Sequence, residues 1–143
     1  MRRNLFLLSL TALIISFGLA FVSSNARADD VVDIRAIIED QTAAISAGDG
    51  KRAFGYATPN IQARIGSSDM FLRMVESRYS MLINPKLFRV EDVQLRGNQA
   101  AARAHVVAKD GRAFKAVYPL KKQPNGEWRI DGCYLELLSD RAV

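Results

Sequence analysis

The second half of the chain contains the residues whose types could carry chemistry. They are Asp92, Arg103, His105, Tyr118, Asp131 and Cys133. His105 is the single histidine of the sequence, and a neighbouring carboxylate would keep its imidazole basic and aligned for proton transfer. A purely structural interpretation is also open, in which Asp92 pairs with Arg103 across two strands and His105 is a partly exposed strand residue. The elements that position these side chains decide between the two.

Strand-like runs separated by turn dipeptides surround the candidate residues. The dipeptides Gly97-Asn98, Asp110-Gly111 and Asn125-Gly126 are typical of tight hairpins. They delimit four predicted strands, over residues 87–96, 99–109, 112–122 and 127–138. Consecutive hairpins form an antiparallel meander, and strands of this length must twist and curl. We therefore expect a curved four-stranded antiparallel sheet.

Hairpin geometry predicts which side chains share a face of that sheet. A two-residue turn at Gly97-Asn98 places Asp92 opposite Arg103, and one at Asp110-Gly111 places Arg103 opposite Tyr118. Besides the six candidates, this face should hold Phe88, Val90, Val107, Phe114, Leu120, Leu135 and Leu137. The other face should hold Val93, Ala100, Ala102, Ala104, Val117, Trp128 and Ile130, together with several charged residues. We take the first face as the concave one, although a β-bulge would reverse the faces of a strand.

Short helices are predicted before the sheet. They cover residues 30–47, 50–56 and 59–65, and a stretch that begins at Ser67 or Ser68. Gly48 and Gly66 end the first and third helices, whereas Asp49 and Thr58 are suited to cap the second and third. The fourth helix should carry Met70, Phe71, Met74 and Val75 on one face. Helices followed by strands predict an α+β fold, with the N-terminal helices packed on one face of the sheet.

Three segments resemble a known family. They are residues 33–41 (DIRAIIEDQ), 61–66 (IQARIG) and 128–133 (WRIDGC). They resemble an exported bacterial family catalogued as domain of unknown function 4864, and the resemblance covers nearly all of residues 30–137. Helices followed by a long curved sheet are similar to the nuclear transport factor 2-like cone. The resemblance implies a cone-like fold with a pocket, and not a particular reaction.

The superfamily resemblance also implies how an enzyme of this fold would work. Enzymes with this cone use a pocket Asp or an Asp-His pair for proton transfer, with a tyrosine or another donor on the oxyanion. Here the resemblance implies His105 as the base, Asp92 or Asp131 as its orienting partner, and Tyr118 as the donor.

The first 28 residues are organised like a secretory signal peptide. Arg2 and Arg3 precede an uncharged apolar run over residues 5–22, and the segment ends in Ala26-Arg27-Ala28. This pattern predicts cleavage after Ala28, which leaves residues 29–143 as a single domain without a membrane anchor. The apolar run of 18 residues is also at the lower edge of a membrane-spanning length, so an uncleaved anchor is the alternative. We expect a periplasmic or secreted protein.

Composition excludes several classes of site. The formal net charge of +5 includes three arginines of the first 28 residues, and residues 29–143 have 17 basic against 15 acidic groups. Nucleic-acid binding is therefore not expected. One Cys and one His cannot form a Cys/His zinc site or an intramolecular disulfide, and no cofactor or metal motif is present. In an oxidising compartment a free thiol needs an explanation, and for Cys133 we expect burial.

These observations predict an exported domain that binds a small ligand or a periplasmic protein. The candidate pocket consists of Asp92, Arg103, His105, Tyr118, Asp131 and Cys133. Two alternatives from other classes stay open. One is a proton-transfer enzyme of isomerase, dehydratase or cyclase type that uses an Asp-His pair. The other is a structural or assembly protein that forms a homodimer through the open face of the sheet.

Overall fold

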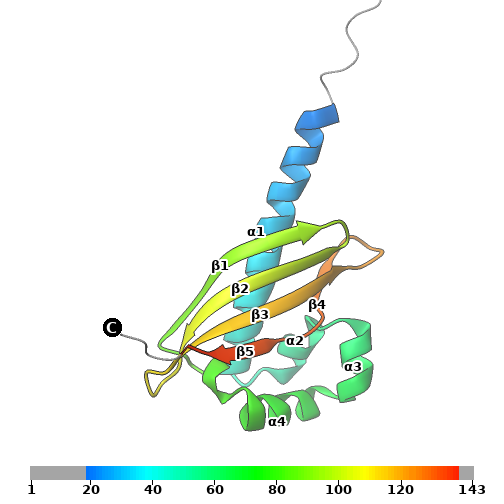
Figure 1. Ribbon diagram of the computed structural model, residues 1–143. Helices are drawn as coiled ribbons and strands as arrows, with labels where there is room; N and C mark the ends of the chain where they lie inside the picture. The colour runs from blue at the N-terminus through cyan, green and yellow to red at the C-terminus, as the bar shows by residue number, and fades with distance from the viewer. Residues whose placement is uncertain (1–18, 139–143) are drawn as a thin grey trace, which may run out of the picture.

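A long helix crosses one face of a curved antiparallel sheet, and three shorter helices gather at one end (Figure 1). The computed structural model describes residues 19–138, so the basic start and most of the apolar run of the predicted signal lie outside the described residues. The helices are α1 (Leu19–Ser46), α2 (Gly50–Gly55), α3 (Pro59–Ile65) and α4 (Ser68–Arg78), followed by a 3-10 turn, η1 (Ser80–Leu82). The strands are β1 (Leu87–Arg96), β2 (Gln99–Val107), β3 (Ala113–Lys122), β4 (Trp128–Ile130) and β5 (Tyr134–Leu137). The predicted α+β class is confirmed.

The short helices begin where the sequence predicts because side-chain caps satisfy their free backbone N–H groups. Asp49 accepts a hydrogen bond from the Arg52 N–H at 3.1 Å, and Thr58 caps α3 with Pro59 at its first position. Ser67 caps α4 in the same way. These caps fix where α2, α3 and α4 enter the structure.

Two helix predictions were wrong in detail. Helix α1 is already formed at Leu19, the first residue that the structure describes, instead of starting at residue 30, and the alanines before Asp29 favour a helix there. On α4, Phe71 and Val75 are buried but Met70 is 49% exposed. The i, i+4 pair of Phe71 and Val75 defines the packed stripe, and Met70 lies about 100° away from Phe71 around the helix.

The register of β1 against β2 agrees with the prediction only near the first turn. Gly97-Asn98 forms a two-residue turn, and Asp92 lies opposite Arg103 as predicted. Between Val90 and Asp92 the register shifts by one residue. This β-bulge at Glu91 brings Val90 opposite Ala104, so that both side chains are buried on the same face.

The predicted register of β2 against β3 was wrong by one residue. The chain turns through the three residues 109–111, with the Ala108 N–H donating to the Arg112 carbonyl at 2.9 Å. Gly111 supplies the left-handed conformation that such a loop requires, at φ 89°. Tyr118 consequently lies opposite Ala102 and not opposite Arg103. Compared with a two-residue turn, a three-residue loop shifts the register by one residue, so the side chains of β2 that were predicted to share a face with Tyr118 lie on the other face.

The predicted fourth strand was also wrong, because it is two short strands. Asn125-Gly126 again belongs to a three-residue loop, so Trp128 and Ile130 of β4 point to the buried face. β4 and β5 pair with opposite ends of β3. Between them Pro119 accepts a hydrogen bond from the Asp131 N–H at 2.8 Å, but its ring leaves it no N–H to return. Gly132, at φ 151°, carries the chain past this gap.

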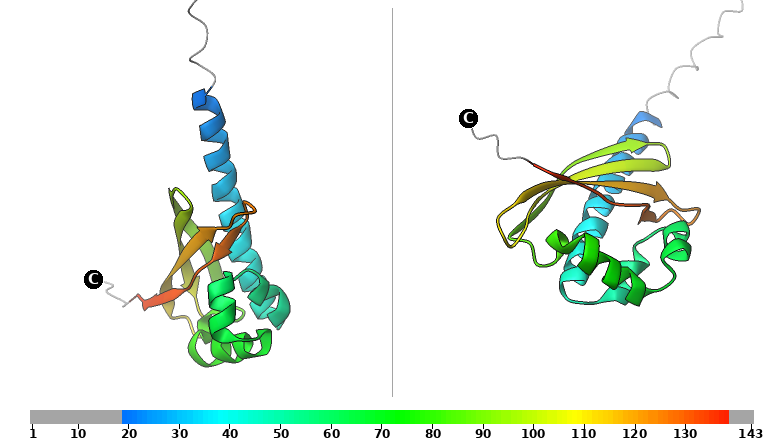
Figure 2. Two further views of the ribbon diagram at one scale, coloured as in Figure 1. Left: turned by 90° about the vertical axis from the view of Figure 1, so that its right-hand side faces the viewer. Right: turned by 60° about the horizontal axis from the view of Figure 1, so that its bottom comes forward.

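The buried face of the sheet differs from the predicted one. Its buried side chains are Val90, Ala100, Ala102, Ala104, Val106, Phe114, Ala116, Tyr118, Leu120, Trp128 and Ile130. Helix α1 covers this face with Ile34 and Ile38, both fully buried, and Figure 2 shows the helix and the sheet as two adjacent layers. The small alanines of β2 let the large α1 side chains approach the sheet. A second, smaller cluster of Ala44, Ile45, Ala53, Phe71 and Val75 joins α1 to α2 and α4.

One arginine joins α1 to the β-bulge. The Arg35 guanidinium donates hydrogen bonds to the carbonyl of Val90 and, at 3.2 Å, to that of Glu91. These are the carbonyls at the register shift of β1. Arg35 therefore satisfies backbone groups at the bulge and holds β1 against the helix.

We predict that Arg35→Ala lowers the free energy of unfolding by about 1 kcal/mol, because it removes charge-assisted hydrogen bonds in a partly exposed setting. Urea denaturation of residues 29–143 measures the change. Arg96→Ala, at the solvent-exposed end of β1, is the matched control and should change stability by less than about 0.5 kcal/mol. Equal effects of the two substitutions would contradict this role of Arg35.

Candidate functional site

The structure divides the six candidate residues into two groups. Tyr118 and Cys133 line a cavity under the helices, together with Asp131. Arg103 and His105 lie on the opposite, outward face of the sheet, where Asp92 pairs with Arg103. The single predicted pocket is therefore not assembled. The cause is the error in the predicted register of β2 against β3. The predicted register placed Arg103 and His105 on the face of Tyr118, whereas the observed register places them on the other face.

The outward group, Asp92, Arg103 and His105, is arranged as the structural interpretation predicted, with Asp92 paired to Arg103 and His105 partly exposed on its strand. Asp92 accepts hydrogen bonds from Arg103 and Gln94, and both paired charges are about half exposed. The Arg103 hydrogen bond, acting against the cost of burial, holds the pKa of Asp92 below its usual value. His105 lies between Arg89 of β1 and Lys115 of β3 in the register. The Asp-His arrangement that proton transfer requires is not formed by His105 with Asp92 or with Asp131.

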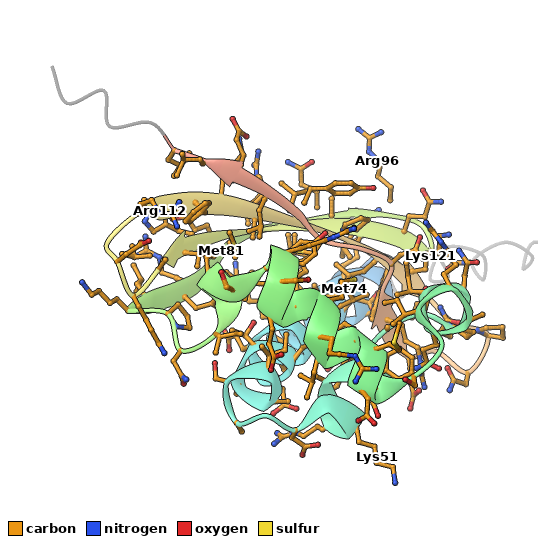
Figure 3. The ribbon with its side chains drawn as sticks, turned by 90° about the horizontal axis from the view of Figure 1, so that it is seen from below. Lys51, Met74, Met81, Arg96, Arg112 and Lys121 are labelled. Atoms are coloured by element: carbon orange, nitrogen blue, oxygen red, sulfur yellow. The ribbon has the colours of Figure 1, made fainter. Side chains whose placement is uncertain are left out.

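The inward group belongs to a cavity of about 350 Å³ at the junction of the two hydrophobic clusters. The apolar side chains of its wall come from α1, α3, α4, η1 and the sheet. They are Ile45, Ile61, Ile65, Phe71, Met74, Val75, Leu82 and Ile130. Figure 3 views the molecule from the helix end, with Met74 on α4 in front of the sheet. The volume is at the lower end of the range for small-ligand sites, and a mostly apolar wall with few polar groups is typical of them.

Tyr118 lines this cavity, and its buried hydroxyl has no partner at normal hydrogen-bond distance, while Thr42 and the Cys133 thiol lie close enough to influence its pKa. The side chain is 1% exposed, and its Oη atom is unpaired. Phe88 holds the ring edge-on, with ring centroids 6.5 Å apart. The neighbouring Thr42 hydroxyl donates instead to the Ile38 carbonyl at 3.0 Å. An unpaired buried hydroxyl costs about 1–3 kcal/mol, so its presence here requires an explanation.

The groups around Tyr118 are held in their neutral forms. Burial, with a smaller contribution from the neighbouring Cys133, raises the pKa of Tyr118 well above its ordinary value. Burial also raises the pKa of the Cys133 thiol to about 12. Tyr79, whose hydroxyl donates to the Cys133 carbonyl at 3.3 Å, has its pKa raised mainly by burial. The deep part of the cavity therefore presents neutral hydroxyl and thiol groups.

Charged side chains lie instead beside α3. Asp131 accepts hydrogen bonds from the Thr58 hydroxyl and from Lys121, both at 2.8 Å. Burial alone would raise the pKa of Asp131, but these two donors outweigh it and hold the pKa below its usual value. Figure 3 places Lys121 at the α3 side of the sheet. Arg64, in the last turn of α3, also lines the cavity.

Sequence reasoning missed the helical half of this cavity. Gln41, Arg64 and Tyr79 come from α1, α3 and the end of α4, and no motif joins them. The signal available was the position of Arg64 next to Ile61 and Ile65, which are apolar residues at helical spacing. That pattern identifies a packed helix but not the partner against which it packs.

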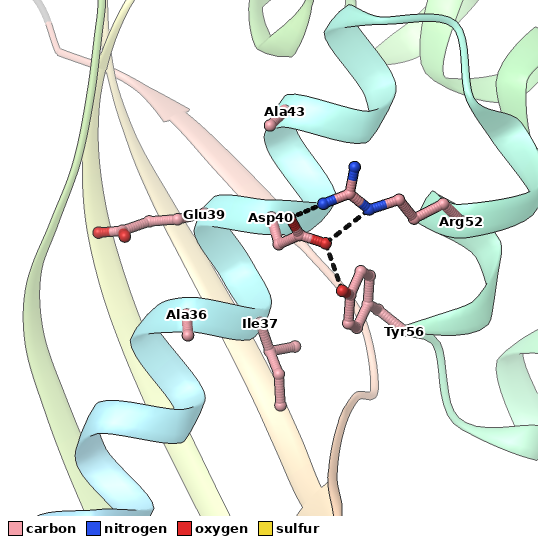
Figure 4. Close-up of a pocket in the computed structure, with 7 residues that line it drawn as sticks. All are labelled: Ala36, Ile37, Glu39, Asp40, Ala43, Arg52 and Tyr56. Atoms are coloured by element: carbon pink, nitrogen blue, oxygen red, sulfur yellow. Dashed lines mark hydrogen bonds and ion pairs between the residues drawn. The ribbon is translucent and has the colours of Figure 1, made fainter.

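Two larger hollows lie on the surface beside α1 and are more open to solvent. One of about 610 Å³ is lined by the Asp40 cluster, in which Arg52 and Tyr56 both donate to the Asp40 carboxylate (Figure 4). The other, of about 430 Å³, lies next to it along α1. In the Asp40 cluster both carboxylate oxygens accept hydrogen bonds, and the cluster joins α1 to α2. We therefore take the cavity between the helices and the sheet, which is less open than either hollow, as the candidate site.

Residues 19–138 contain no group of three or more His, Cys, Asp or Glu side chains placed to hold a metal ion. In the same residues, no helix has the length and apolar character needed to cross a membrane.

Comparisons with solved structures find proteins of similar architecture. The chain is similar to an NTF-2 like protein of unknown function from Burkholderia xenovorans LB400, at 16% identity over 78% of this chain and 87% of that chain, with a TM-score of 0.49. It is also similar to an NTF2-like protein of unknown function from Cytophaga hutchinsonii ATCC 33406, at 13% identity over 73% and 88% of the two chains, with a TM-score of 0.43. No curated protein matches the chain.

The family is shown by a comparison with family models. The model of DUF4864, a domain of unknown function, matches residues 27–143. That range includes all the residues that line the cavity. The resemblance predicted from three short segments is confirmed, and the chain belongs to the DUF4864 family.

Proposed function

We propose that the protein is exported and binds a small, mostly apolar molecule with a hydrogen-bond acceptor in the cavity between the helices and the sheet. The observation that carries this proposal is the unpaired buried hydroxyl of Tyr118, a residue that lines a largely apolar cavity of about 350 Å³. A bound acceptor would satisfy this hydroxyl. The cost of leaving the group unpaired in the empty protein is then recovered on binding.

The neutral state of the deep groups supports an uncharged acceptor at that depth. Tyr118 and Cys133 stay protonated at neutral pH because burial raises the pKa of both. Their O–H and S–H groups can donate, and the hydroxyl is the stronger donor of the two. A carbonyl or ether oxygen can accept there without bringing a charge into an apolar environment.

The surroundings of the predicted cleavage site support export. Residues 25–29 are exposed at the start of α1, whereas Asp30 accepts hydrogen bonds from Lys122 and Trp128, each at 2.8 Å. Cleavage after Ala28 would remove the exposed turns of α1 and keep the contacts of Asp30 with the sheet. Figure 1 shows this end of α1 extending beyond the sheet.

We predict that Tyr118→Phe weakens ligand binding without weakening the fold. Fluorescence titration of N-phenyl-1-naphthylamine into residues 29–143, with displacement by 2-nonanone, measures affinity. Loss of one hydrogen bond to the ketone should weaken the binding of 2-nonanone by about five- to tenfold. The free energy of unfolding of the empty protein should equal that of the unmodified protein or exceed it by up to about 1 kcal/mol.

Tyr56→Phe is the matched control, because it removes a hydroxyl that donates to Asp40 outside the cavity. It should lower stability and leave the affinity for 2-nonanone unchanged. If neither N-phenyl-1-naphthylamine nor 2-nonanone binds the unmodified protein, the proposed function is wrong. A loss of stability in Tyr118→Phe larger than about 1 kcal/mol would show that the hydroxyl has a structural partner.

We predict that Cys133 reacts slowly with iodoacetamide in the native protein. At pH 8, a thiol whose pKa is about 12 instead of the ordinary 9.0 has roughly a thousandfold less thiolate, which is the reactive form. Mass spectrometry of protein labelled with and without 8 M urea measures the two rates. A native rate within tenfold of the unfolded rate would contradict burial of this thiol.

We predict that the protein recovered from the periplasm of a bacterial host begins at Asp29. N-terminal sequencing and intact mass measure the processed end. Ala28→Leu should block cleavage, because the cut requires a small residue, whereas Ala43→Leu, at an exposed position farther along α1, should be processed normally. Membrane-bound protein that retains residues 1–28 would support the uncleaved anchor instead.

A further inference from the structure

We propose that the cavity selects a carboxylic acid with an apolar tail, whose carboxylate is bound by Arg64 at the mouth of the cavity. This inference rests on the proposed function and specifies the class of ligand. It is carried by the position of Arg64 in the cavity wall, next to the apolar side chains of the same helix.

Helix α3 presents apolar and basic groups to the same cavity. Ile61, Arg64 and Ile65 all line it, and their i, i+3 and i+4 spacing places them on one side of the helix. Ile61 and Ile65 are partly buried, whereas Arg64 is exposed. The long arginine side chain can therefore follow the apolar wall while its guanidinium stays in water.

The charge of Arg64 is available to a ligand. Within residues 25–138, no ion pair or hydrogen bond engages its guanidinium at the usual distances. The one carboxylate of the cavity wall, Asp131, is already occupied, because Thr58 donates to one of its oxygens and Lys121 to the other, both at 2.8 Å. Arg64 lies near enough to Asp131 for its charge to help lower the pKa of that carboxyl. Lys121 already pairs with Asp131, so these three groups together keep one net positive charge.

The depth of the cavity and its mouth therefore differ in what they can bind. The deep wall consists of apolar groups with the neutral Tyr118 and Cys133, so it would strongly disfavour an unpaired charge. Arg64, at the exposed edge, can bind a carboxylate through two parallel hydrogen bonds. An amphiphile would place its tail inside and its acid group at Arg64. Any acceptor along the tail would meet the hydroxyl of Tyr118.

The test compares ligands of equal length that differ in charge. Displacement of N-phenyl-1-naphthylamine from residues 29–143 at pH 7.5 gives the affinities of nonanoate, 2-nonanone and 1-nonanol. We expect nonanoate to bind at least fivefold more tightly than either neutral ligand at 20 mM NaCl. This advantage should shrink at 300 mM NaCl, because the guanidinium is exposed to screening ions.

The matched variants are Arg64→Gln and Arg73→Gln. Arg73 is an exposed arginine of α4 outside the cavity wall, so both variants remove one positive charge from the helical end. Arg64→Gln should weaken the binding of nonanoate about five- to tenfold and leave the affinity for 2-nonanone unchanged. Arg73→Gln should change neither affinity. Lys121→Gln should also weaken nonanoate, because it exposes the uncompensated charge of Asp131.

The possible failures are distinguishable. Equal affinities for nonanoate and the neutral ligands, or no effect of Arg64→Gln, would overturn the carboxylate inference and leave the proposed function in place. An equal loss for charged and neutral ligands in Arg64→Gln would show a packing role and would also overturn it. If none of the three ligands displaces the dye and the dye itself does not bind, the proposed function fails first.

Discussion

Strand β3 is the element on which the rest of the structure depends. It pairs with β2 along one edge and with β4 and β5 along the other. The alternation of its side chains sends Phe114, Ala116, Tyr118 and Leu120 to the helices. Each neighbouring strand must bury its own apolar side chains on the same face, so its register against β3 is determined by that requirement. The odd-length loops and the bulge at Glu91 are the adjustments that satisfy it.

The cavity follows from how the helices meet this face. Helix α1 packs directly on the sheet, whereas α2 and α4 pack on α1 and form a second hydrophobic cluster. The two clusters are separate, with Tyr79 packed against both, and the cavity lies at their junction. The space left there is bounded by α3 and α4. A cavity at such a junction can be kept without weakening either cluster, because each is close-packed by itself.

The polar groups of the cavity are graded from its depth to its edge. Tyr118 is buried and Cys133 is partly buried, and both are neutral; Asp131 is partly buried and paired, and Arg64 is exposed. This gradation is what electrostatics permits, because a charge costs least where water still reaches it. The Asp-His pair of the enzyme hypothesis is not formed, because His105 lies on the other face of the sheet from Asp131.

The sequence by itself determined the elements and the family. N-caps, glycines and turn dipeptides act over a few residues, and for that reason Asp49, Thr58, Ser67 and the three hairpins were found where predicted. What only the tertiary structure decided is which candidates meet. A dipeptide such as Asp110-Gly111 fits loops of two or three residues, and the choice reverses a whole strand because side chains alternate with a period of two. Burial of the alanines of β2 against α1 made that choice and placed Arg103 and His105 on the outward face, whereas the position of α3 brings Arg64 to the cavity.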